Sequence, residues 1–194
     1  MIITLKSGQT RIVRQIKALN ATNKAIEDQV KECNELRKAF ATEQIKLKNA
    51  TEFMKELEYS IESLSIKMNA CVGMIEETKV GKRGVYYSAL EHYYTYSTER
   101  ESAKKQLELA TKAQKTQLAI FNNAKRKRDE AEDCLIDMLV TAQDFASELG
   151  LALNLDFSSR YYKNLQIMKS RQEGGDIEVV IPEPIEIEED ASEQ

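Results

Sequence analysis

A row of apolar residues at seven-residue spacing constrains this chain more than any other feature. Ten consecutive positions of the row are apolar: Ile12, Leu19, Ile26, Cys33, Phe40, Leu47, Met54, Ile61, Met68 and Ile75. A seven-residue repeat sustained over this length predicts a long helix that lies along another helix, as in a coiled coil. At ~1.5 Å of rise per residue, a helix from residue 10 to about residue 79 would be on the order of 100 Å long.

The second apolar row of this helix is irregular. Its members lie four residues after the first row at Ile16 and Val30, but three residues after it at Leu57, Leu64 and Cys71. Polar residues occupy the companion positions in the middle of the helix. The buried face therefore moves round the helix, and we expect its two ends to contact different neighbours.

A second helix is predicted after a break at residues 79–84, which contains two glycines. Apolar residues at alternating spacings of three and four indicate that it runs from about Tyr86 to Leu149 and that Gly150 ends it. Two helices of similar length joined by a short break favour an antiparallel hairpin. If the chain reverses direction near residue 82, facing residues have numbers that sum to about 165, so Cys33 should lie near Ala131 and Cys134. Because a two-helix core is thin, we expect a third helix, self-association or a partner protein.

The C-terminal third adds a short helix and a tail. Residues 134–157 are apolar on nearly every side, so they should be buried on more than one side. Ser158 or Ser159 can cap a third helix over residues 160–172, with Tyr161, Leu165 and Met168 on one face. Isoleucine and valine alternate with other residues after residue 176, which predicts an extended strand. The tail could pair with residues 2–5, add to a partner's sheet, or be disordered.

The fold class expected is therefore all-α. We predict a long antiparallel, coiled-coil-like helical hairpin with a short third helix and extended termini. Three regions follow: an extended N-terminal arm over residues 1–9, the hairpin with its third helix over residues 10–172, and an acidic extended tail over residues 173–194.

Charge and cysteine usage limit the class of protein. The formal net charge of −4 hides an acidic tail, because residues 173–194 contain nine acidic and no basic side chains. The body is mildly basic. The three cysteines are widely spaced and form no metal-binding pattern, which favours buried thiols in a reducing compartment. No apolar run is long enough to span a membrane. We expect a cytoplasmic location, or one within a virus-like or multiprotein assembly.

Catalytic motifs are absent from the sequence. His92 is the single histidine, no Gly-rich phosphate loop is present, and no Cys/His cluster could hold zinc. The serine and cysteine side chains lack an obvious base other than His92. We therefore expect no enzymatic activity, no metal and no cofactor.

The tip of the predicted hairpin is the first candidate for a binding site. Basic residues in the break are followed by tyrosines, a combination suited to contacts with a protein or a phosphate-bearing ligand. The alternative is that the rings cap the end of the bundle with their hydroxyl groups in water. The candidate site residues are Lys79, Lys82, Arg83, Tyr86, Tyr87, Tyr93, Tyr94 and Tyr96.

A basic run at residues 125–128 resembles a nucleic-acid patch, but acidic residues follow it at four-residue spacing. On a helix, Arg126 would meet Glu130 and Arg128 would meet Glu132, so a solvated face with cancelling charge is the favoured interpretation. The hydrophobic-acidic tail at residues 177–180 resembles short motifs that bind ubiquitin-like modifiers by strand addition, but strand pairing in general is the favoured reading.

These features favour a structural or assembly protein that self-associates or docks into a larger complex through its helical seams. A component of a viral particle or a secretion-type assembly would fit. The alternative is a binding module whose Tyr/Lys/Arg-rich tip contacts nucleic acid or another phosphate-bearing partner. The near-neutral body argues against extensive phosphate contact.

Overall fold

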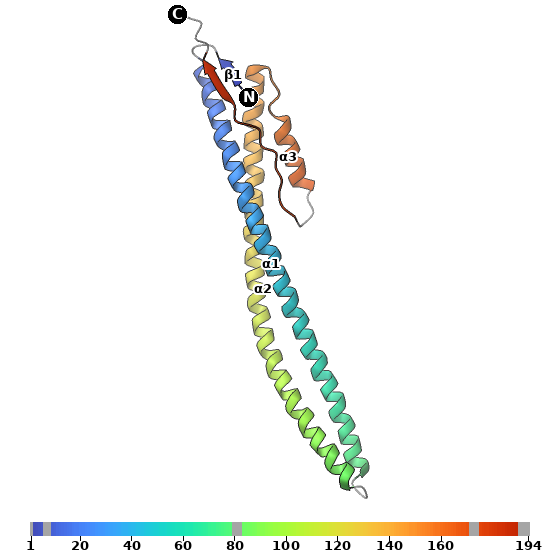
Figure 1. Ribbon diagram of the computed structural model, residues 1–194. Coiled ribbons are helices and arrows are strands. Elements are labelled where there is room, and N and C mark those ends of the chain that lie inside the picture. The colour runs from blue at the N-terminus through green and yellow to red at the C-terminus, as the bar shows by residue number, and fades with distance from the viewer. Residues whose placement is uncertain (1, 6–8, 79–82, 171–174, 190–194) are drawn as a thin grey trace, which may run out of the picture. The chain divides into compact units, whose positions relative to one another are not determined.

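The computed structural model describes residues 2–5, 9–78, 83–170 and 175–189 and confirms the helical hairpin (Figure 1). The elements are β1 (Ile2–Leu5), α1 (Thr10–Thr78), α2 (Arg83–Leu153), α3 (Ser159–Ser170) and β2 (Glu186–Glu189). Contacts between α1 and α2 run in antiparallel order. Among the described residues, no helix combines the length and the apolar character that crossing a membrane requires.

The chain packs as two compact units. The first combines residues 1–41 with residues 123–194. Its core contains the predicted rows of α1 and α2 together with α3 and the tail, and its most buried large side chains include Ile16, Ile26, Leu135, Leu149, Tyr161 and Ile177. The predicted inner face of α3 is also confirmed, because Tyr161, Leu165 and Met168 are all buried. In this unit, α3 and the tail supply the additional layer that a two-helix core needs.

The second unit, residues 42–122, contains only the facing parts of α1 and α2. Polar seam residues find partners across the two helices. The side-chain amide of Gln114 donates to Thr51 Oγ1 at 3.3 Å, and that of Gln117 donates to Glu43 Oε2 at 2.5 Å. Its buried apolar residues are Leu57, Leu64, Cys71, Ala89 and Ala103, which is a thin core.

The end of α2 corrects the prediction that Gly150 terminates it. The helix continues to Leu153, and Asn154 takes the left-handed conformation (φ 56°) that ends it. The N–H of Leu155 then donates to the carbonyl of Gly150 at 3.0 Å, a Schellman-type closure. A Cβ at Gly150 would lie 2.4 Å from the carbonyl oxygen of Leu155. Gly150 is thus required for close approach of the returning chain, three residues before the helix ends.

Ser158 occupies the N-cap position of α3, as predicted, but the side chain that accepts hydrogen bonds at this end of the helix is that of Asp156. Asp156 Oδ1 accepts from the backbone N–H groups of Ser158 and Ser159 at 3.1 and 3.2 Å. The N–H of Ser159 is the main reason that the pKa of Asp156 is lowered. The carbonyl of Ser158 accepts from the N–H of Tyr162, so Ser158 is the first residue of the helical hydrogen-bond pattern.

The tail is extended over residues 175–189, as predicted, and its last part pairs with residues 2–5. β1 and β2 form a two-stranded parallel sheet in which Ile3 lies opposite Ile187. The tail runs beside α1 and α3 before it reaches β1 (Figure 1). Its alternation sets one face inward: Ile177 and Ile185 are buried, and Glu178 and Glu186 are exposed.

The basic run at residues 125–128 was predicted to form a solvated face, and Arg128 is the exception. Arg126 and Glu130 form the expected ion pair, with 3.7 Å between Nε and Oε1. Arg128 is only 8% exposed, because its guanidinium lies 4.2 Å from the ring centroid of Phe40 and pairs with Asp129. Arg128 occupies a seam position, where the facing helix supplies an aromatic ring that accommodates the cation.

Candidate functional site

The predicted tip is partly described by the structure. Lys79 and Lys82 lie outside the described residues. Arg83 begins α2 and is exposed, and the first turns of α2 carry the five tyrosines.

The tyrosines do not share one environment. Tyr87 and Tyr94 are 64% and 63% exposed, whereas Tyr86, Tyr93 and Tyr96 are half-buried. The ring of Tyr96 stacks on His92 and receives the ammonium of Lys67 at 5.5 Å from its centroid. The tip therefore presents two exposed rings, and its role as a contact surface stays a prediction.

A second group of residues was not predicted. Three asparagines each bind the backbone of one tail residue, with the side-chain NH₂ group as donor and the side-chain oxygen as acceptor. Asn34 Nδ2 donates to the carbonyl of Ile177 at 3.1 Å, and the N–H of Ile177 donates to Asn34 Oδ1 at 2.5 Å. Asn164 on α3 holds Val180 in the same way, at 2.9 and 3.2 Å.

Asn20 completes the set by holding Ile185, at 2.9 and 3.0 Å. We call the part of α1 and α3 that carries Asn20, Asn34 and Asn164 the tail-binding surface. Because these six hydrogen bonds go to main-chain atoms, they recognise an extended backbone and not a side-chain sequence.

The spacing of the asparagines fits the geometry of an extended peptide. Asn20 and Asn34 are fourteen residues apart and therefore lie on the same stripe of α1. The fourteen residue steps from Asn20 to Asn34 rise ~21 Å along the helix, and the eight residue steps from Ile177 to Ile185 span at most ~26 Å when extended. The tail can thus run antiparallel to α1 and meet both asparagines with little slack.

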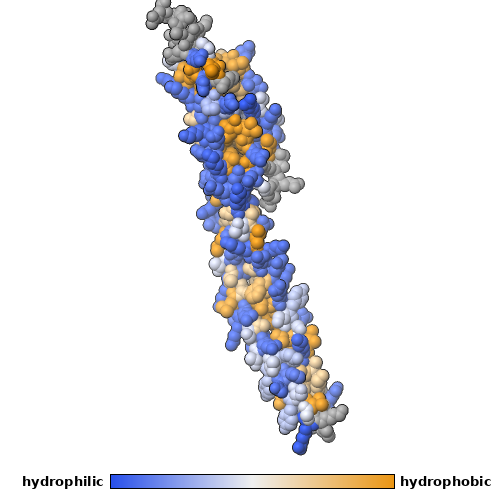
Figure 2. Space-filling model, in the orientation of Figure 1, coloured by the Kyte–Doolittle hydropathy of each residue, from blue (hydrophilic) through white to orange (hydrophobic). Residues whose placement is uncertain are grey.

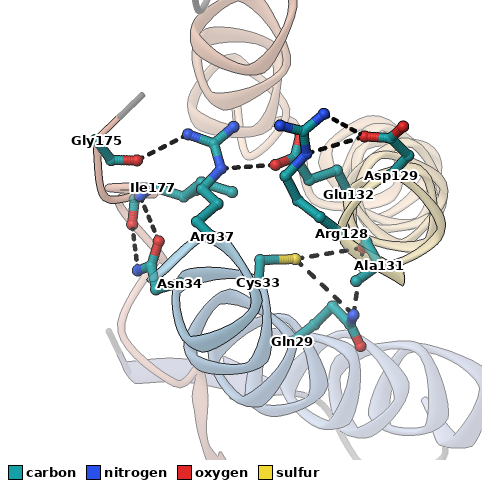
Figure 3. Close-up of polar contacts among 10 residues, drawn as sticks. All are labelled: Gln29, Cys33, Asn34, Arg37, Arg128, Asp129, Ala131, Glu132, Gly175 and Ile177. Carbon is teal, nitrogen blue, oxygen red and sulfur yellow. Dashed lines mark hydrogen bonds and ion pairs between the residues drawn. The ribbon is translucent and has the colours of Figure 1, made fainter. Parts of the chain in front are cut away.

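Charged groups fix the first part of the tail (Figure 3). Arg37 lies between α2 and the tail: its Nε is 2.6 Å from Glu132 Oε1, and its Nη1 donates to the carbonyl of Gly175 at 2.8 Å. Gly175 has φ +100°, a conformation that glycine adopts without strain. The exposed pair Lys38 and Asp176, 3.5 Å apart, lies one residue further along each segment.

A cavity of about 540 Å³ adjoins the tail-binding surface. The tail residues 180–183 line one part of it, and α1, α3 and the connection between α2 and α3 line the rest. Its buried polar groups satisfy each other, because the hydroxyl group of Tyr161 donates to Asn23 Oδ1 at 2.5 Å. Burial raises the pKa of Tyr161, so this hydroxyl stays protonated and acts as a donor.

Cys33 is buried in the core of the same unit, where α1 faces α2. Its Sγ is 3.3 Å from the carbonyl oxygen of Ala131, which confirms the predicted proximity of these two residues. The side-chain amide of Gln29 donates to the same oxygen (Figure 3). Burial raises the pKa of the Cys33 thiol to about 11. Cys71 is buried as well, but Cys134 is exposed, so the prediction of buried thiols was wrong for Cys134.

Apolar surface interrupts the hydrophilic surface of the hairpin (Figure 2). In the unit of residues 42–122, exposed fractions are 60% for Ile45, 70% for Tyr59, 63% for Ile66 and 66% for Leu109. A pocket of about 350 Å³ crosses both helices there, and we call it the alanine pocket. Its lining is Ala50, Phe53, Gln106, Leu109, Ala110 and Ala113.

The sequence offers only a weak signal for these asparagines. Asparagine is a weak helix former, so an asparagine within a long helix can have a task other than helix formation. The seven-residue spacing does not single out Asn20 and Asn34, because Asn69 lies at the same spacing in the unit that does not contain the tail. Asn164 gave no such signal, because α3 is too short to show a repeat.

Comparison with known proteins adds no identity. No protein-family model, no curated protein and no solved structure matches this chain. In the part of the chain that the structure describes, no three His, Cys, Asp or Glu side chains are grouped so that they could hold a metal ion.

Proposed function

We propose that this protein is a non-enzymatic assembly protein that associates with a second copy of itself through the unit of residues 42–122. One observation carries the proposal: this unit consists of two helices and leaves large apolar side chains in contact with water. In the other unit, residues of α3 and the tail add to the core that α1 and α2 form. Contiguous apolar surface on a protein commonly marks a site of protein association.

The heptad positions of the exposed residues support this proposal. Ile45, Tyr59 and Ile66 are separated by multiples of seven residues, so they lie on one stripe of α1. Tyr59 and Ile66 each follow a buried leucine, Leu57 or Leu64, by two residues. Two residues correspond to about 200° round a helix, so this stripe lies opposite the seam. Packing between the two helices therefore cannot explain its apolar residues.

The alanine pocket is a second apolar feature, which crosses both helices and therefore lies on a different face of the unit from the stripe; it offers a place for a further helix. Its alanines allow close approach of a second backbone, and Phe53 and Leu109 (50% and 66% exposed) supply apolar contact at its sides. A second copy of the unit would make four helices, an arrangement in which helices bury a common apolar core. We therefore assign the pocket to the same unit of a second copy.

The test compares two exposed leucines. Leu109→Glu places a charge at the alanine pocket, and Leu151→Glu is the matched control, because Leu151 is 87% exposed and lies in the other unit. Removing one buried leucine from an interface costs about 1.5–3 kcal/mol, which weakens association by roughly 10- to 150-fold. Sedimentation equilibrium of the full chain measures the association constant.

We expect the wild-type chain and Leu151→Glu to associate equally and Leu109→Glu to dissociate. A wild-type chain that stays monomeric at all concentrations would refute the proposal, as would equal association of the two variants. Retention of nucleic acid at low salt, lost at high salt, would instead favour the tip of α2 as the functional surface.

A further inference from the structure

The tail-binding surface holds its peptide in a way that does not require the peptide to belong to the same chain. All six asparagine hydrogen bonds go to main-chain atoms of Ile177, Val180 and Ile185. Main-chain hydrogen bonds provide affinity in peptide recognition by strand addition, and pockets for alternate side chains provide register. Here Ile177 and Ile185, 2% and 8% exposed, fill those pockets.

We propose that the tail-binding surface is an extended-peptide site and that its partner in trans is the tail, residues 175–189, of a second copy of this chain. A second copy is the occupant that the structure specifies, because its tail makes the same hydrogen bonds and apolar contacts. The charges also match, since Arg37 and Lys38 meet the carbonyl of Gly175 and the carboxylate of Asp176. Two copies can exchange tails reciprocally and leave every contact satisfied.

The balance between the two forms depends on concentration. Because the contacts are the same in both forms, the tail in cis is favoured only by its effective concentration, which is on the order of millimolar for a short connection. Exchange therefore becomes extensive when copies are concentrated or held together. The proposal goes beyond association through residues 42–122, because it uses a different surface and different residues.

Isotope-mixed cross-linking of the wild-type chain tests the exchange. Light and heavy-nitrogen chains are mixed at equal amounts, held at about 1 mM, diluted, and treated with a zero-length reagent that joins amines to carboxylates. Lys38 and Asp176, 3.5 Å apart, report on the tail. Lys31 and Asp28, 3.2 Å apart within α1, are the internal control.

We expect mixed-isotope products for the Lys38–Asp176 link, rising toward about half of that product as exchange approaches completion. The Lys31–Asp28 link should stay within one isotope. Single-isotope products for Lys38–Asp176 at every concentration would overturn the proposal. The Leu109→Glu variant should still give mixed products at high concentration, so failure of the proposed association surface and failure of tail exchange are distinguishable.

A synthetic peptide tests whether the site reads the backbone. Heavy-isotope peptide 175–189 is added in excess to the full-length chain, and its cross-link to Lys38 is measured. N-methylation at Val180 removes the N–H that Asn164 accepts, and N-methylation at Glu178, which no asparagine holds, is the matched control. Loss of a hydrogen bond that leaves a buried partner unsatisfied weakens binding by roughly tenfold or more.

We expect the Val180-methylated peptide to bind about tenfold more weakly than the Glu178-methylated peptide. Equal binding of the two peptides would overturn backbone recognition. An unmodified peptide that gives no cross-link to Lys38 would overturn the trans site itself.

Discussion

Replacing Asn34 by alanine would remove one of the three contacts that hold the tail. The side chain of Asn34 is half-buried, and its two bonds to Ile177 are 3.1 and 2.5 Å long. Alanine keeps the helix but leaves the N–H and carbonyl groups of Ile177 without these partners. Because Ile177 itself is 2% exposed, water can replace the lost bonds only if the segment moves.

The expected size of the effect follows from the two lost hydrogen bonds. They contribute about 1 kcal/mol each, so their loss costs about 2 kcal/mol. Alanine is a better helix former than asparagine, but α1 is helical whether the tail is attached or detached, so this difference does not change the population of the detached tail. The loss of about 2 kcal/mol would raise that population by roughly thirtyfold.

Hydrogen exchange of the backbone amides measures that population directly. In Asn34→Ala, we expect the N–H of Ile177 to exchange roughly thirtyfold faster than in the wild-type chain. Asn49→Ala is the matched control, because Asn49 is an exposed asparagine on the same helix and gains the same helix propensity. If Ile177 exchanged at the same rate in both variants, the asparagine contacts would not hold the tail.

Two further predictions follow from local geometry. Gly150→Ala should lower the free energy of unfolding by about 1–3 kcal/mol in a urea titration, because its Cβ would lie 2.4 Å from the carbonyl oxygen of Leu155; Gly84→Ala, with open space around it, should not. A stable Gly150→Ala variant would show that the turn can move at little cost. Because the pKa of Cys33 is raised, the folded state holds the thiol proton more tightly than the unfolded state. The free energy of unfolding should therefore keep its full value below pH 9 and decrease as the pH rises from 9 to about 11. Iodoacetamide should label Cys134 well before Cys33 at neutral pH, as mass spectrometry would show, and equal labelling would argue against the burial.

Much of the secondary structure was predictable because it depends on local periodicity. The apolar row of α1 marked a helix over residues 10–79, and the observed helix is Thr10–Thr78. The glycine-bounded break located the turn of the hairpin, and the contact between Cys33 and Ala131 agrees with it. The short strands at both termini were visible as well, because alternation with a period of two is a local property.

The role of single polar residues was less predictable. Arg128 belongs to a basic run, and only the ring of Phe40 on the facing helix explains why it is buried. The predicted tip gave a set of tyrosines, yet the structure exposes only Tyr87 and Tyr94 to a large extent. Burial of such side chains depends on the facing element, which a periodic pattern does not identify.

The sequence by itself determined that this chain forms two long helices, a short third helix and extended ends, because seven-residue and two-residue periods arise from backbone geometry alone. Only the tertiary structure decided which surfaces are covered. It placed the tail across Asn20, Asn34 and Asn164, and it left the apolar stripe at Ile45 and Ile66 open to water. The physical reason is that an asparagine side chain can bond to the main chain of any extended segment, so the side chains of the tail do not reveal which segment it holds.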